Sequence, residues 1–116
     1  VTIGSDLGVR PIPERIGYCP SKAGVIMLTK CIALEYAPKV RVNCVLPGLV
    51  RTPMTEQRFL DAEDPAALEE AYASLYPLHK MGKVADMANA VRFLSCSEDS
   101  GFITGEIMNV CGGSLI

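Results

Sequence analysis

One long apolar segment, residues 17–37, constrains the fold of this chain more than any other feature. Its interior is apolar almost all the way round a helix, and its few polar residues are Thr29, Lys30 and Glu35. A helix of this composition has to bury more than one face. We therefore expect one face to pack on a β-sheet and another to pack on a partner helix, which could belong to a second subunit.

The first turn of this helix carries Tyr18 and Lys22, four positions apart and therefore on one side of the helix. Lowering a tyrosine pKa from about 10 to neutrality requires about 4 kcal/mol. One positive charge about 4 Å away supplies that amount at an effective dielectric of about 20. Unrelated surface residues can have the same spacing, so the meaning of the pair depends on the surrounding sequence.

Small and polar residues follow the apolar runs at points where strands would end. Ser5 follows a run that includes Val1 and Ile3, and Pro47-Gly48 closes a Val-rich run, with Thr52 four residues after the glycine. Open α/β sheets place ligands at the carboxyl ends of their strands. Taken alone, however, Ser5 also fits a turn or cap, and Pro47-Gly48 fits an ordinary strand-ending turn.

Together these segments resemble the short-chain dehydrogenase/reductase family. The matching segments are Ile3-Gly4-Ser5, Tyr18-Cys19-Pro20-Ser21-Lys22-Ala23-Gly24, Val42-Asn43-Cys44-Val45-Leu46-Pro47-Gly48, Thr52-Pro53-Met54 and Thr104-Gly105 with Gly112-Gly113. They follow the family's order but cover only the second half of a family member. The family commonly has Asp before the double glycine, where this chain has Cys111, and the difference affects a local turn hydrogen bond.

The resemblance implies an NAD- or NADP-dependent oxidoreductase that interconverts a carbonyl and an alcohol by hydride transfer. Tyr18 would exchange the proton with the substrate oxygen, Ser5 would donate a hydrogen bond to that oxygen, and Lys22 would lower the pKa of Tyr18 and bind the nicotinamide ribose. Thr52 would hold the carboxamide or a phosphate. The implied cofactor-binding residues are Tyr18, Lys22, Pro47, Gly48, Val50 and Thr52.

The same resemblance leaves alternatives open. The family's glycine-rich loop, its catalytic asparagine and the residue that selects NAD or NADP would lie upstream. The first residue is Val1 and not Met, so we expect a partial sequence. The chain could therefore be a non-catalytic fragment or assembly partner. An epimerase or dehydratase relative would share the Tyr/Lys pair, although the ending with Thr104-Gly105 and Gly112-Gly113 argues against it.

The expected elements alternate between strands and helices, which indicates an α/β fold with a parallel sheet. By resemblance this is the C-terminal part of one Rossmann-type, doubly wound domain covering residues 1–116. Asp64-Pro65 predicts a helix cap followed by a first-turn proline. Residues 53–64 resemble the family's variable segment that covers the substrate, which implies a mobile cover, and residues 97–105 predict a polar turn. The expected strands are 1–4, 40–46 and 107–111, and the expected helices are 17–37, 65–76 and 84–96.

Charge, hydropathy and cysteine spacing argue against nucleic-acid binding, a membrane span and a zinc site. The net charge is −2 without a basic run, so we expect no nucleic-acid partner, and no apolar stretch approaches the ~20 residues of a membrane span. The five cysteines form no C-x-x-C pattern, which predicts no zinc site and fits a reducing compartment such as the cytoplasm. We expect four of them to be buried, Cys19 to be a spacer, and His79 to have a surface or capping role.

Overall fold

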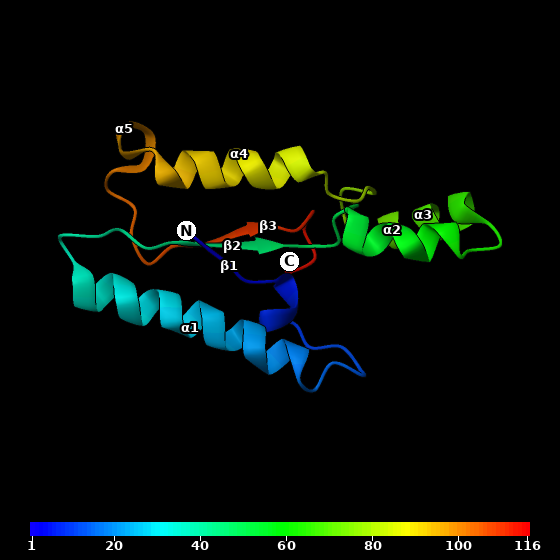
Figure 1. Ribbon diagram of the computed structural model, residues 1–116, viewed down its shortest axis with the longest axis horizontal. Helices are drawn as coiled ribbons and strands as arrows, with labels where there is room; N and C mark the ends of the chain where they lie inside the picture. Colours follow the sequence, from blue (N-terminus) through cyan, green and yellow to red (C-terminus); the bar gives the residue numbers. More distant parts are fainter.

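The computed structural model describes residues 1–116 and contains a three-stranded parallel sheet between two helical layers (Figure 1). The strands β1 (Thr2–Ile3), β2 (Cys44–Pro47) and β3 (Ile107–Val110) lie in the order β1-β2-β3. Helix α1 (Tyr18–Tyr36) covers one face of the sheet and α4 (Val84–Ser95) covers the other. This arrangement confirms the predicted α/β class with a partial Rossmann-type sheet.

The central strand β2 forms the core of the sheet. Cys44, Val45 and Leu46 are fully buried, because β2 has a strand on each side and a helix on each face. A continuous apolar run is typical of a parallel strand buried in this way. The strand begins at Cys44 and not at Val40, because the N–H of Val42 donates to the side-chain oxygen of Thr104 instead of to a neighbouring strand.

Most predicted helices are confirmed, with small changes at their ends. Helix α1 and α4 match their predicted ranges to within one residue. Helix α3 (Pro65–Ala73) starts at the predicted proline, and Asp64 caps it by accepting a hydrogen bond of 3.0 Å from the N–H of Ala67. It ends three residues before Tyr76, the last residue predicted for it.

Two segments for which no helix was predicted contain helices. Residues 53–64, predicted as a mobile cover, include helix α2 (Pro53–Leu60), and the predicted polar turn includes the short helix α5 (Ser97–Ser100). In α2 only Phe59 is buried, so the sequence shows little apolar periodicity. Its start is specified by capping instead, because the Thr55 hydroxyl accepts a hydrogen bond of 2.9 Å from the N–H of Thr52.

Helices α2 and α3 project beyond the carboxyl ends of the strands, away from the two helical layers (Figure 1). They contact each other through Phe59 and Tyr72, whose rings meet edge to face with centroids 5.9 Å apart. No helix in the structure combines the length and the apolar composition that crossing a membrane requires.

The cysteines correct one prediction from the sequence. Cys19, Cys44 and Cys111 are buried and Cys96 is half-buried, but Cys31 is exposed. Apolar residues follow Cys31 in the sequence and Lys30 precedes it, and this residue lies on the face of α1 that points away from the sheet. Its exposure therefore depends on which side of the helix the sheet covers.

Candidate active site

Tyr18 and Lys22 lie in the first turn of α1, next to the end of β1. The Lys22 Nζ atom is 5.7 Å from the centroid of the Tyr18 ring. The same ammonium group donates a hydrogen bond of 3.2 Å to the backbone oxygen of Ile3. Tyr18 is 43% exposed, so its side chain remains accessible from solvent beside a fixed positive charge.

Ser5 stands at the carboxyl end of β1 and is buried. It caps the short helix η1 (Asp6–Gly8), because its Oγ atom accepts a hydrogen bond of 3.2 Å from the N–H of Leu7. The same hydroxyl donates to the Asp6 carboxylate over 3.2 Å. Ser5 thus has the capping role that the sequence left open, and its hydrogen is directed to Asp6.

Helix η1 holds Ser5 close to the turn that carries Lys22. A Cβ atom at Gly8 would lie 2.8 Å from the carbonyl carbon of Lys22, so glycine is needed for this close approach. The Asp6 carboxylate also accepts a hydrogen bond of 2.7 Å from the Ser114 hydroxyl. The structure therefore places η1, which follows Ser5, beside the turn that carries Tyr18 and Lys22, and it ties Asp6 to the C-terminal turn.

The backbone after β2 passes through a crowded region. The N–H of Gly48 donates a hydrogen bond of 3.3 Å to the backbone oxygen of Val110. A Cβ atom at Gly48 would lie 3.1 Å from both Cys111 Cα and Tyr76 Cε1, and a larger residue would push these groups apart. Pro47 ends β2 opposite Val110, so the predicted end of this strand at Pro47-Gly48 is confirmed.

Val50 and the double glycine are held by backbone geometry. Val50 pairs with Gly82 in an isolated parallel bridge, which fixes the segment that leads from β2 to α2. At the other strand end, Gly112 and Gly113 have φ values of 60° and 91°, a left-handed conformation that favours glycine. Cys111 contributes to this turn through its backbone oxygen, which accepts from the N–H of Ser114 at 3.1 Å.

Tyr76, the last residue of the helix predicted over 65–76, also lies in this region. It is buried, as packing requires, but its hydroxyl oxygen also accepts a hydrogen bond of 2.8 Å from the N–H of Leu49. Burial raises the pKa of Tyr76, and the Leu49 hydrogen bond opposes that rise. The neutral phenol therefore holds the backbone next to Gly48, a role visible only once residues 27 positions apart are brought together.

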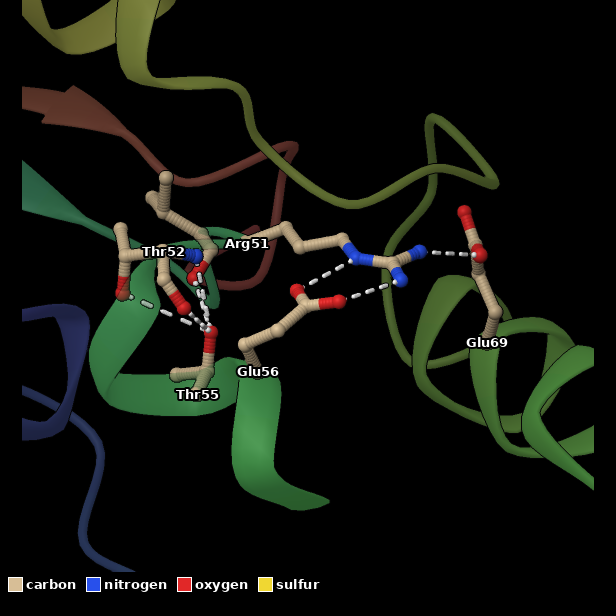
Figure 2. A network of polar contacts seen from close by, with 6 residues as sticks. Arg51, Thr52, Thr55, Glu56 and Glu69 are labelled. Carbon is tan, nitrogen blue, oxygen red and sulfur yellow. Dashed lines mark hydrogen bonds and ion pairs between the residues drawn. The ribbon is translucent and has the colours of Figure 1, made fainter. Parts of the chain in front are cut away.

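Thr52 is the N-cap residue of α2 and is half-buried. Figure 2 shows its N–H directed to the Thr55 hydroxyl, at 2.9 Å. Its own Oγ atom has only a long contact of 3.5 Å with the same hydroxyl. The Thr52 hydroxyl is therefore available to a ligand, whereas its N–H is not.

Arg51 forms a network that the sequence did not indicate. Its Nε and Nη2 atoms each donate to the Glu56 carboxylate at 3.0 Å, and its Nη1 atom donates to Glu69 at 2.8 Å (Figure 2). The Glu56 hydrogen bond raises the pKa of Arg51 and lowers that of Glu56. The guanidinium carbon also lies 4.5 Å from the centroid of the Phe59 ring. Arg51 thereby joins the segment after β2 to both α2 and α3.

A cleft of about 440 Å³ opens beside Gly48 and Tyr76, and a second of about 530 Å³ separates the 9–16 loop from the start of α1. The second cleft has apolar walls that include Val9, Ile12 and Pro20.

His79 is exposed in the turn after Tyr76. No group of three or more His, Cys, Asp or Glu side chains is arranged to hold a metal ion.

Several known proteins are similar to this chain in sequence, and several solved structures are similar to it in fold. A family model described as enoyl-(acyl carrier protein) reductase matches residues 1–114. The 4-formylbenzenesulfonate dehydrogenase TsaC1/TsaC2 of Comamonas testosteroni is 43% identical over 117 residues, which cover 100% of this chain and 46% of that protein. Dehydrogenase/reductase SDR family member 4 of Bos taurus is 41% identical over 116 residues, covering 99% of this chain and 40% of that protein.

Solved structures give the same result. ElxO with NADP bound has a TM-score of 0.88 at 35% identity, covering 97% of this chain and 44% of that chain. The 4-hydroxyisoleucine dehydrogenase complexed with NADH has a TM-score of 0.86 at 33% identity, covering 97% of this chain and 45% of that chain.

The parallel sheet and the residues gathered at its carboxyl edge define a Rossmann-type α/β protein. Within that class, the chain belongs to the short-chain dehydrogenase/reductase family. The resemblance found in the sequence is thus confirmed. The chain spans less than half the length of the curated relatives described above.

Proposed function

We propose that residues 1–116 are the C-terminal part of a single Rossmann-type domain and carry the catalytic half of an NAD- or NADP-dependent oxidoreductase. The enzyme would interconvert a carbonyl and an alcohol in a small-molecule substrate. The observation that carries this proposal is the position of Tyr18 and Lys22 at the end of β1, the strand that leads into Ser5. The Lys22 ammonium lies 5.7 Å from the Tyr18 ring and donates a hydrogen bond to Ile3. Relatives named as dehydrogenases, and neighbours solved with NADH or NADP, support it.

The residues present fit a nicotinamide cofactor. The Thr52 hydroxyl is available, and a side chain at Gly48 would crowd the backbone that a ring would lie against. Lys22 uses one of its three N–H donors on Ile3, which leaves others for ribose hydroxyls. The bound cofactor supplies or accepts a hydride. The residues that would hold it are Tyr18, Lys22, Pro47, Gly48, Val50 and Thr52.

Each catalytic side chain would act on the substrate oxygen. Tyr18 donates its phenolic proton to that oxygen during reduction and takes a proton back during oxidation. Lys22 keeps a positive charge beside the proposed proton donor, with its ammonium 5.7 Å from the centroid of the Tyr18 ring. Ser5 donates a hydrogen bond to the oxygen as negative charge develops. Because a hydroxyl has one hydrogen, Ser5 has to turn away from Asp6 when the substrate binds.

The complete polypeptide that contains these residues provides the test. Oxidation of NADH or NADPH would be measured with a panel of ketones and aldehydes, in the parent and in Tyr18→Phe. We expect turnover in the parent and a loss of at least about 100-fold in the variant, with unchanged circular dichroism. Full activity in Tyr18→Phe would contradict the assignment of the proton donor. A parent without turnover on any substrate would favour the alternative of a non-catalytic assembly partner.

The outward face of α1 supports a second proposal, that the complete protein assembles with a further copy of itself through this helix. Met27, Cys31 and Leu34 share one side of α1 at positions i, i+4 and i+7. Met27 is 58% exposed and Leu34 is 84% exposed, an apolar surface of the kind that marks protein interfaces. An exposed thiol at Cys31 would stay reduced in the cytoplasm or another reducing compartment, where we place the protein.

A further inference from the structure

The segment that joins β2 to α2 is anchored on the body of the protein. Val50 pairs with Gly82, and the N–H of Arg51 donates a hydrogen bond of 3.2 Å to the backbone oxygen of Gly82. The next residue, Thr52, is the N-cap of α2. The backbone of Arg51 therefore belongs to the body, and the projecting pair of helices, α2 and α3, begins directly after it (Figure 1).

The side chain of Arg51 contacts both projecting helices. It forms a bidentate pair of hydrogen bonds with Glu56 of α2 and a third hydrogen bond with Glu69 of α3 (Figure 2). All three guanidinium nitrogens are engaged in these bonds. Arg51 is therefore not a site for an anionic group of the substrate, because its charge is already matched by two carboxylates.

The ionic contacts lie next to the apolar contact that joins α2 to α3. The guanidinium group of Arg51 stacks on Phe59, which is only 2% exposed and meets Tyr72 of α3 edge to face. Arg51 thus forms hydrogen bonds with both glutamates and also contacts the Phe59 ring. A planar guanidinium can form bidentate hydrogen bonds and stack on an aromatic ring at the same time, whereas a lysine ammonium cannot.

We propose that Arg51 is a positioning residue, which fixes the α2–α3 pair relative to the carboxyl ends of β1 and β2 and so sets the affinity for substrate. This inference rests on the proposed function, because α2 begins at Thr52, a residue proposed to hold the cofactor. If Arg51 releases the two glutamates, α2 and α3 keep their mutual contact through Phe59 and Tyr72. They then remain attached through the backbone and through the bond from the Thr55 hydroxyl to the Val50 oxygen, but lose the ionic contacts that restrain the pair.

The exposure of the network makes the attachment adjustable. The side chains of Arg51, Glu56 and Glu69 are 41%, 40% and 53% exposed. Exposed ion pairs are weak and are screened by salt. The attachment of α2–α3 should therefore loosen as the salt concentration rises, and this dependence should disappear once Arg51 is replaced.

Hydrogen–deuterium exchange on the complete polypeptide tests the attachment without using activity. Arg51→Gln should raise the exchange of amides in residues 53–73 about two- to fivefold, and leave those of α1 and α4 unchanged. Arg58→Gln is the matched control, since Arg58 lies on α2 and makes no ion pair. The double variant Arg51→Gln/Glu56→Gln should exchange little faster than either single variant, because both substitutions remove the same contact. Exchange in Arg51→Gln equal to that of the parent would overturn the proposal.

Steady-state kinetics then tests the positioning role. We expect KM for the carbonyl substrate to rise about two- to fivefold in Arg51→Gln, with kcat nearly unchanged, and Arg51→Lys to recover part of the loss. Faster exchange together with an unchanged KM would overturn the link to substrate affinity. A parent without turnover would count against the proposed function, and exchange alone would then decide whether Arg51 holds the helices.

Discussion

The ammonium group of Lys22 donates a hydrogen bond of 3.2 Å to the backbone oxygen of Ile3, the last residue of β1. This bond attaches the first turn of α1 to the strand that leads into Ser5. The same ammonium lies over the Tyr18 ring. One side chain therefore restrains the position of the turn and places a positive charge beside the proposed proton donor.

Lys22→Met should separate the positioning of the turn from the binding of the cofactor. In the complete enzyme, Lys22→Met should weaken cofactor binding, because the ammonium is proposed to bind the nicotinamide ribose. At saturating cofactor the rate of alcohol oxidation should still be lower than in the parent, because the turn that carries Tyr18 loses its bond to Ile3. A parental rate at saturating cofactor would mean that Lys22 acts on the cofactor alone.

Residues 1–116 expressed alone should aggregate and bind NADH or NADPH poorly. The outer edge of β1 has no neighbouring strand in this chain, and Ile3 at that edge is 48% exposed. An apolar strand edge of this kind promotes association. Size-exclusion chromatography and cofactor titration would check this; a monodisperse product with micromolar affinity would contradict it.

Leu34→Glu should disrupt assembly of the complete protein through α1. Leu34 is 84% exposed, so the substitution should leave the fold of one subunit intact while placing a charge in the proposed interface. Leu75→Glu is the control, because Leu75 is also largely exposed, at 61%, but lies outside α1. Light scattering should show a smaller particle for Leu34→Glu alone. Parental mass in both variants would rule out the interface.

Tyr76→Phe should lower the free energy of unfolding by about 1 kcal/mol, because the N–H of Leu49 loses its acceptor. Denaturant titration at neutral pH measures this loss. Burial raises the pKa of Tyr76 above its value in the unfolded chain, so its contribution is present below pH ~10 and is lost as the pH rises through the higher folded value. Tyr76→Phe should lack that part of the alkaline destabilisation. Equal stability of both proteins at neutral pH would show that the bond contributes nothing.

The sequence by itself determined the elements whose signals are local. The apolar run of α1, the Asp64-Pro65 start of α3 and the buried run of β2 each specify structure through neighbouring residues. The motifs around Ser5, Tyr18 and Thr52 also sufficed to find the family. Helix α2 was not predicted, because its capping residues, and not an apolar stripe, define it.

Only the tertiary structure decided how distant residues meet. The bond from Leu49 to Tyr76 joins positions 27 apart, and that from Ser114 to Asp6 joins positions 108 apart. Arg51 reaches Glu69 across 18 positions. Periodicity describes a residue's neighbours within one helix or strand, whereas these contacts depend on how whole elements pack. For the same reason, the exposure of Cys31 followed from the side of α1 that the sheet covers.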